Sequence, residues 1–288
     1  RAGASDADAR AGASDSDARA GASDADARAR RDAAGSAMRA GPDAAKRIRL
    51  PSIDALRGIA IIAMAAYHFA FDLRMLGVTH SDFEHATFWL AARATIVTSF
   101  MMLVGISLAL AGEAQVPLAR HLRRLARIAL CAALVTIASY AIFPRTFIYF
   151  GVLHCIAVAS LAAWPLRRAP AIAAAAGVAI IAAGLTVSDA AFDPRALSWI
   201  GFMTHKPATE DYVPLFPWAG VIQLGIAAGH AVIRANRRAD APGRAFRWTR
   251  APRGLTFLGR HSLAVYMIHQ PVLLCVLGAS LWLGGRLH

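Results

Sequence analysis

The stretch RGIAIIAMAAYHFAFD, residues 57–72, reads as a membrane-crossing helix with charged ends. Its middle is a run of Ile, Ala and Met, which suits a hydrocarbon environment. Arg57, His68 and Asp72 stand where a lipid-facing helix would carry Leu. Ionisable side chains inside a bilayer are costly and are usually functional. The stretch therefore predicts a membrane protein whose first helix carries a functional polar face.

The composition of the whole chain agrees with this reading. The 288 residues are 57% hydrophobic with a mean hydropathy of +0.45, which is more apolar than an ordinary soluble domain. A net charge of +13 could indicate a protein that binds nucleic acid. The basic residues, however, form short clusters between apolar runs, so we expect no nucleic-acid partner. The three cysteines lie inside apolar runs without metal-binding spacing, so we predict neither disulfides nor a metal cofactor.

Seven apolar segments approach the roughly 20 residues that a helix needs to cross a bilayer. They are residues 55–74, 89–111, 125–143, 147–164, 170–187, 215–233 and 262–283. The sequence thus predicts an all-α fold, a polytopic integral membrane bundle of about seven transmembrane helices in a lipid bilayer. Gly225 and Gly229 form a GxxxG motif in the sixth segment, which predicts close packing of one helix pair.

The distribution of basic residues predicts the orientation of the bundle. If the N-terminus is cytoplasmic, 18 of the 24 Lys and Arg residues after residue 45 lie on the cytoplasmic side or at its boundary. The other six are Arg74, Arg93, Arg145, Arg195, Lys206 and Arg286. Because cytoplasmic loops carry an excess of Lys and Arg, we predict a cytoplasmic N-terminus and an outer C-terminus.

Residues 1–45 have a different composition from the rest of the chain. They begin with three copies of a nine-residue unit that starts RAGASD, and they contain no Leu, Ile, Val, Phe or Tyr. Such a segment has nothing to bury, so we predict a disordered tail at 1–45 and a membrane domain at 46–288. Met38 opens a plausible natural start, and we expect residues 1–37 to be dispensable or foreign to the native protein.

Helical geometry gathers the polar residues of the first segment on one face. Arg57 and His68 are 11 residues apart, which is about three turns and about 16 Å of rise. Asp72 follows His68 by four residues, and Asp54 precedes Arg57 by three, so each can meet its neighbour. Taken singly, Arg57 fits a snorkelling anchor and His68 a structural hydrogen bond. For the four together we favour a functional stripe.

Two further histidines, His154 and His269, are predicted to lie at a similar depth in the fourth and seventh segments. With His68 they would line one polar cavity, or each would make a separate interhelical hydrogen bond. The sequence leaves both alternatives open because the rotation of each helix is unknown.

A long polar loop precedes the sixth segment. Residues 199–218, WIGFMTHKPATEDYVPLFPW, combine aromatic residues and prolines with His205, Lys206, Glu210 and Asp211. Loops of this length are often functional. We predict an ordered lid at the outer membrane face; the alternative is an interfacial aromatic belt with solvated charges.

Four blocks of the sequence resemble one family. They are SIDALRGIAIIAMAAYHFAFDL, SFMMLVGISLALAG, THKPATEDYVPLFPWAGVIQLGIAAG and LGRHSLAVYMIHQPVLL. These blocks are similar to the bacterial membrane proteins grouped with the catalytic domain of heparan-alpha-glucosaminide N-acetyltransferase, long a domain of unknown function. The spacing of Arg57 and His68 also resembles the first-span signature of the membrane acyltransferase-3 family.

The resemblance implies a multi-pass enzyme of the bacterial inner membrane. Its donor would be cytoplasmic acetyl-CoA or another acyl-CoA, and its acceptor a sugar hydroxyl or amine on a glycan of the outer side. A homodimer is compatible with it. The heparan substrate is not carried over, because the lysosomal enzyme has additional spans and a luminal domain.

This reaction assigns roles to the polar residues. We predict His68 as the general base, with Asp72 orienting its imidazole or stabilising its cation. Arg57 is predicted to hold the phosphates of CoA. The rest of the predicted donor site is His154, His269 and Gln270, and the predicted acceptor site is Arg93, His205, Lys206, Glu210 and Asp211.

Two other functions compete with acyl transfer. Buried His, Asp and Arg residues also form proton relays in secondary transporters, although seven segments divide badly into two repeats. A non-catalytic membrane subunit would use the same residues as interhelical hydrogen bonds. A tunnel that ends at His68 would favour the enzyme, two rocking halves a transporter, and a dry bundle a structural role.

Overall fold

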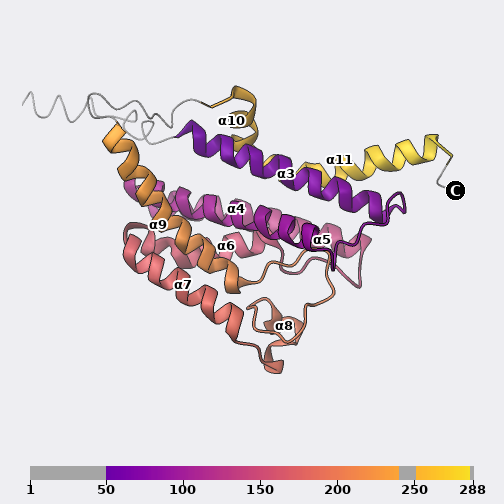
Figure 1. Cartoon of the computed structure of the whole chain (residues 1–288), viewed down its shortest axis with the longest axis horizontal. Helices are drawn as coiled ribbons and strands as arrows, with labels where there is room; N and C mark the ends of the chain where they lie inside the picture. Colours follow the sequence, from indigo (N-terminus) through magenta and orange to yellow (C-terminus); the bar gives the residue numbers. More distant parts are fainter. Residues whose placement is uncertain (1–49, 240–250, 286–288) are drawn as a thin grey trace, which may run out of the picture. The chain divides into compact units, whose positions relative to one another are not determined.

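The computed structural model describes residues 50–239 and 251–285 of the chain. In these ranges every regular element is a helix (Figure 1), as the sequence predicts. The predicted tail at 1–45 lies outside the described residues. The elements are α3 (Pro51–Met75), α4 (Thr87–Glu113), α5 (Leu118–Ile142), α6 (Val152–Ala163), η1 (Trp164–Arg168), α7 (Pro170–Thr186), η2 (Ala190–Phe192), α8 (Arg195–Ser198), α9 (Leu215–Ala239), α10 (Arg253–Arg260) and α11 (Ser262–Leu283).

Five of these helices are long and apolar enough to cross a membrane, which makes the chain a membrane protein. They are α3, α4, α5, α9 and α11, of 22 to 27 residues each. The two remaining predicted spans correspond to shorter helices, α6 of 12 residues and α7 of 17. The count of seven and the side on which each end lies stay predictions.

The fourth helix begins at Val152 rather than at residue 147, which corrects the predicted boundary. Hydrogen bonds to other segments hold residues 147–150 outside the helix. The Ile148 N–H donates to the Ser139 hydroxyl at 3.0 Å, and the Ile148 carbonyl accepts from the Thr136 hydroxyl at 2.7 Å. The Phe150 carbonyl accepts from Val213 N at 3.3 Å. These apolar residues therefore join α5 to the long loop.

The chain still passes from one end of the bundle to the other through α6 and η1. At the start of α6, Val152 N donates to Asp211 in the long loop, whereas in η1 the Arg167 carbonyl lies 2.9 Å from Nε2 of His230. Twelve α-helical residues and five 3₁₀ residues span about 28 Å. That length is close to the roughly 30 Å thickness of a hydrocarbon core.

The centre of the bundle is the crossing of α4 and α9, with α7 packed on α9. The GxxxG motif lies at this crossing, as predicted. A Cβ added at Gly225 would lie 3.0 Å from Cα of Gly105, and one at Gly229 would lie 2.7 Å from Cβ of Ala109. Small residues thus let the two backbones approach closely. Buried Ile222 and Ile226 fill the adjacent core.

Helices α10 and α11 pack on α3, away from that crossing (Figure 1). Glycines set the contact with α10: a Cβ at Gly58 would overlap the Leu255 carbonyl oxygen, and one at Gly259 would overlap the Asp54 carbonyl oxygen. Helix α11 then runs beside α3. This arrangement brings residues near 269 next to the polar face of the first helix.

Candidate functional site

Two histidines face each other between α3 and α11. The ring centroids of His68 and His269 are 4.9 Å apart, and their planes meet at 71°. Nδ1 of His68 lies 3.0 Å from the Met64 carbonyl oxygen, and Nδ1 of His269 lies 2.6 Å from that of Tyr266. Because a carbonyl oxygen only accepts, both Nδ1 atoms must donate. In its neutral form each ring therefore keeps a lone pair on Nε2, where it can take up a proton.

A carboxylate and an amide lie on the same two helices. Asp72 is fully buried, and its Oδ1 accepts a hydrogen bond of 2.7 Å from Nε2 of Gln270. Asp72 Oδ2, Gln270 Oε1 and His269 Nε2 are buried without a hydrogen-bond partner. Buried polar atoms are nearly always paired, so three unpaired atoms in one place call for a ligand. Two oxygens and an imidazole nitrogen suit a hydroxyl or amine donor.

The structure thus brings together four of the predicted residues: His68, Asp72, His269 and Gln270. Asp72 interacts electrostatically with His68. The hydrogen bond that orients the His68 ring, however, comes from its own helix through the Met64 carbonyl. Asp72 is therefore oriented by Gln270 and lies within Coulombic range of His68.

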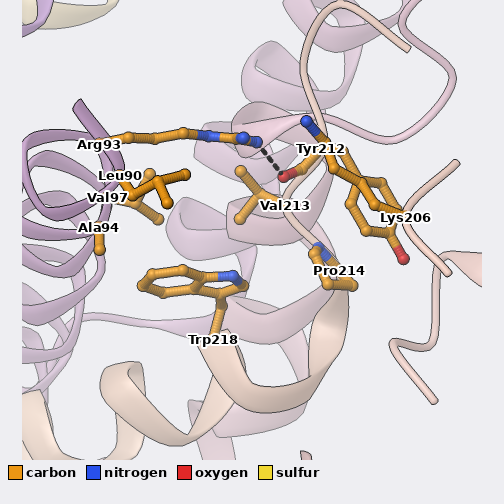
Figure 2. Close-up of a pocket in the computed structure, with 9 residues that line it drawn as sticks. All are labelled: Leu90, Arg93, Ala94, Val97, Lys206, Tyr212, Val213, Pro214 and Trp218. Atoms are coloured by element: carbon orange, nitrogen blue, oxygen red, sulfur yellow. Dashed lines mark hydrogen bonds between the residues drawn. The ribbon is translucent and has the colours of Figure 1, made fainter. Parts of the chain in front are cut away.

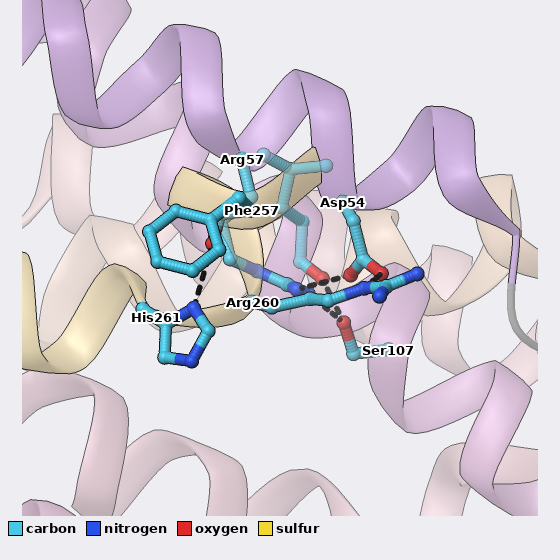
Figure 3. A network of polar contacts seen from close by, with 7 residues as sticks. Asp54, Arg57, Ser107, Phe257, Arg260 and His261 are labelled. Carbon is cyan, nitrogen blue, oxygen red and sulfur yellow. Dashed lines mark hydrogen bonds and ion pairs between the residues drawn. The ribbon is translucent and has the colours of Figure 1, made fainter. Parts of the chain in front are cut away.

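Arg57 lies in a polar network at the other end of α3 (Figure 3). It donates to Asp54 at 3.1 Å and to the Ser107 hydroxyl of α4 at 2.8 Å. Nε of Arg260 in α10 shares Asp54 at 3.4 Å. The predicted pairing of Asp54 with Arg57 is confirmed. A guanidinium has five N–H groups, so Arg57 keeps donors for an anion beyond these contacts.

Arg124 of α5 is a further basic residue near Arg57, and the sequence interpretation missed it. Its guanidinium is within Coulombic range of Arg57 and Arg127. Within the described residues it has no hydrogen bond or ion pair. Asp54 pairs with Arg57 but not with Arg124, so Arg124 is repelled by its two cationic neighbours, and an anion bound there would relieve this repulsion.

Helical periodicity offered a signal for Arg124. The buried positions of α5 include His121, Leu125 and Ile128, which recur every three or four residues. Arg124 falls on that stripe, whereas its neighbour Arg123 is exposed. The cluster RHLRRLAR could therefore have been divided into exposed arginines and one half-buried arginine, Arg124.

His154 lies apart from the histidine pair and makes hydrogen bonds of its own. It is the third residue of α6, so it sits near a helix end rather than at mid-depth. Its Nδ1 accepts from Gly151 N at 3.2 Å, which leaves Nε2–H to donate to the Thr136 hydroxyl at 3.2 Å. Of the three histidines predicted to share a depth, the structure therefore brings two together.

The polar residues of the long loop are divided between two surroundings. Glu210 accepts from the Thr146 hydroxyl at 2.6 Å and Asp211 from Val152 N at 3.0 Å, so both fasten the loop to the segment before α6. His205 is exposed, with Nδ1 3.6 Å from Oδ2 of Asp193. Arg93 and Lys206 instead line a pocket together (Figure 2).

This pocket has a volume of about 250 Å³. Its walls come from α4, the long loop and the start of α9, namely Leu90, Arg93, Ala94, Val97, Lys206, Tyr212, Val213, Pro214 and Trp218. Arg93 donates to the Tyr212 carbonyl at 2.9 Å across the opening. Tyr67 connects the pocket to the histidine pair: it is within Coulombic range of Arg93, and its ring centroid lies 6.0 Å from that of His68.

A second histidine–carboxylate pair, also missed, lies on the loop between α3 and α4. Nδ1 of His85 is 3.2 Å from the oxygens of Asp82, and both side chains are exposed. The backbone N–H of His85, followed by that of Glu84, also bonds Asp82 and holds its pKa below the ordinary value. The spacing of Asp and His three residues apart before a helix could have indicated this turn. Within the described ranges no group of three or more His, Cys, Asp or Glu residues has a metal-binding arrangement.

Comparison with protein families gave a match over most of the described residues. The family model described as heparan-alpha-glucosaminide N-acetyltransferase, catalytic, matches residues 49–271. That range begins just before α3 and ends within α11, so it contains the histidine pair, Asp72, the pocket and the Arg57 network. Searches of curated proteins and of solved structures gave no match. The match covers most of the chain, and the chain belongs to the heparan-alpha-glucosaminide N-acetyltransferase catalytic family.

Proposed function

We propose that the protein is a membrane acetyltransferase. It would move an acetyl group from cytoplasmic acetyl-CoA to a hydroxyl or amine of a glycan on the outer side of a bacterial inner membrane. The observation that carries this proposal is the cluster of His68, His269, Asp72 and Gln270, which holds three unpaired acceptor atoms between α3 and α11. Three such atoms at one place fit a bound hydroxyl or amine, and family membership favours acetyl transfer over transport.

In the proposed reaction Nε2 of His68 takes a proton from the acceptor hydroxyl or amine. The acceptor atom attacks the thioester carbonyl carbon, the carbon–sulfur bond breaks, and CoA leaves as the thiolate. The imidazolium returns its proton to the sulfur. The Asp72 carboxylate would stabilise the imidazolium, and its unpaired Oδ2 would hold the acceptor. The ring centroids of His269 and His68 are 4.9 Å apart, so the two imidazoles would be coupled in their titration. His269 would then hold a proton in the state in which His68 is neutral.

The donor would enter from the end of α3 that carries Arg57. CoA bears phosphates, which guanidinium groups bind by charge-assisted hydrogen bonds. Arg57 is fixed by Asp54 and Ser107, whereas Arg124 lies beside it without a carboxylate partner. The pantetheine arm would then run along α3 toward His68, which is about 16 Å further along the helix. A tunnel along this path stays a prediction.

Replacing Arg124 by Gln tests the donor site. We expect KM for acetyl-CoA to rise about 10- to 100-fold, because a hydrogen bond to a charged group contributes about 1.5–3 kcal/mol. The rate at saturating donor should change little. Arg123→Gln is the matched control, since Arg123 is exposed on the same helix and, within the described residues, its side chain bonds only the Ala119 carbonyl. Equal KM values in both variants would remove Arg124 from the donor site.

Replacing Asp72 by Asn tests the carboxylate. Asn keeps an oxygen for Gln270 but removes the charge that would stabilise the imidazolium, so we expect kcat to fall about 100-fold. Initial rates should be normalised to the inserted protein. Asp189→Asn serves as control, because Asp189 is exposed and caps η2, a position that Asn fills equally well. An unchanged kcat would show that the charge of Asp72 has no part in transfer.

The proposed function itself is tested with membranes that contain or lack the protein. They are incubated with acetyl-CoA labelled in the acetyl group, and the membrane glycans are then separated from free donor. We expect label in a glycan fraction only when the protein is present. Acetyl-CoA consumption equal in both membranes, with no labelled acceptor, would contradict the proposal.

A further inference from the structure

The pocket between α4, the long loop and α9 has two cations and an aromatic ring as its chemically distinctive walls. Figure 2 shows the Arg93 side chain reaching across toward Tyr212, with the Trp218 indole on the opposite side. Lys206 is the other charged residue of the lining, and no carboxylate lines the pocket. The remaining walls are apolar side chains and the Tyr212–Pro214 segment.

Neither cation of the pocket is neutralised by an ion pair in the described part of the chain. Arg93 donates a hydrogen bond to the neutral carbonyl of Tyr212. Lys206 makes no ion pair in the described part of the chain. The pKa of Lys206 is lowered, first by partial burial and next by repulsion from Arg93. Two like charges held close together without a carboxylate partner favour the binding of an anion.

Three carboxylates surround Lys206 at longer range, Glu84, Asp211 and Glu210, and each raises its pKa by less than Arg93 lowers it. None of the three lines the pocket. Asp211 and Glu210 direct oxygens to Val152 N and to the Thr146 hydroxyl. These acids therefore moderate the positive charge of the loop and leave the pocket wall itself cationic.

We propose that this pocket binds an acidic sugar residue of the acceptor, with its anionic group between Arg93 and Lys206 and its ring against Trp218. A volume of about 250 Å³ is below the range of about 300–1,000 Å³ that takes drug-sized ligands, so it suits a single ring. The apolar face of a sugar packs on an indole, while a carboxylate or phosphate accepts from a guanidinium and an ammonium. The inference rests on the proposed function, since it names the class of acceptor for the same reaction.

Tyr67 relates the pocket to the proposed reaction site. That residue precedes His68 in α3 and is within Coulombic range of Arg93. An acidic ring held by Arg93 would thus place its own or a neighbouring hydroxyl or amine toward the histidine pair. The pocket would select the acceptor, and the pair would perform the transfer.

Binding to the purified full chain tests this inference without any acyl transfer. The probes are methyl glucuronide, glucose 6-phosphate and the neutral methyl glucoside, with the change in tryptophan fluorescence as readout. We expect one or both acidic probes to bind at least tenfold more tightly than the neutral one, and the preferred acid distinguishes a carboxylate from a phosphate source. Lys206→Gln should reduce this preference to about threefold or less, and raised salt should weaken it.

The controls separate the possible failures. Arg145→Gln removes an exposed outer-side arginine that is not part of the pocket and should keep the preference. Trp218→Phe should remove most of the fluorescence change. Equal affinity for acidic and neutral probes, or a preference unchanged in both Lys206→Gln and Arg93→Gln, would overturn the inference. Acidic binding without labelled transfer would instead contradict the proposed function and leave this pocket as an anionic-sugar site.

Discussion

Replacing His68 by Ala is expected to lower acetyl transfer by about 10²- to 10⁴-fold, the usual contribution of general base catalysis. The physical reason is the placement of its Nε2, which is free to take a proton because Nδ1 donates to the Met64 carbonyl. His68 faces His269 across 4.9 Å between ring centroids, beside the buried charge of Asp72. Without the imidazole, the acceptor would have to lose its proton to water or to a ring held by another helix.

The measurement is the initial rate of label transfer, divided by the amount of inserted protein. Insertion should be unchanged, because His68 is only partly buried and its own hydrogen bond is to the helix that carries it. His80→Ala is the matched control: an exposed histidine in the loop after the same helix. A His68→Ala protein that is well inserted and transfers at the wild-type rate would remove His68 from the catalytic role.

Replacing Gly105 by Ala is expected to have the largest effect on stability. A Cβ at this position would lie 2.7 Å from Cα of Gly225 and would overlap the Ile222 carbonyl oxygen. Backbone atoms cannot move aside, so α4 and α9 would have to separate at the centre of the bundle. Overpacking of this kind costs typically 1–3 kcal/mol, and we expect the upper end, about 3 kcal/mol. That cost exceeds the roughly 1 kcal/mol that Ala gains over Gly in a helix.

The net loss of about 2 kcal/mol should lower the apparent melting temperature of the purified protein by about 4–8 °C, since each kcal/mol corresponds to about 2–4 °C in a chain of this size. Gly278→Ala in α11 is the matched control, because a Cβ there meets nothing within 4 Å. It should keep or slightly raise the melting temperature through helix propensity alone. If both variants melt alike, the close α4–α9 crossing is not what holds the bundle together.

Much of the fold follows from patterns that are local in sequence. The long apolar runs predict α3, α4, α5, α9 and α11, and the spacing of Gly225 and Gly229 predicts a close helix crossing. The start of α6 could not be predicted in this way. Residues 147–150 are apolar enough for a membrane helix, but hydrogen bonds with Ser139 and Val213 hold them outside α6, beside the long loop. A hydropathy profile does not take account of such long-range hydrogen bonds.

The candidate site was likewise predictable where it depends on local spacing and not where it depends on contacts between helices. Helical spacing places His68 and Asp72 on one face of the first helix, as the structure has them. That α11 brings His269 and Gln270 against this face depends on helix rotation, which sequence periodicity did not define. The pocket of Arg93, Lys206 and Trp218 joins a helix, a loop and a second helix that are far apart in the chain. No sequence spacing connects such residues. Arg93 and Lys206 were therefore both predicted for the acceptor site, but their position in the wall of one pocket was not.

Transfer across the membrane is the central claim, and sealed inside-out vesicles test it most directly. Acetyl-CoA labelled in the acetyl group is added outside, where the cytoplasmic face of such vesicles lies. We predict labelled glycan in the lumen, protected from an impermeant deacetylating enzyme until detergent is added, and strongly reduced in His68→Ala vesicles. Labelled product that is accessible on the donor side, or lumenal labelling that His68→Ala leaves unchanged, would contradict it.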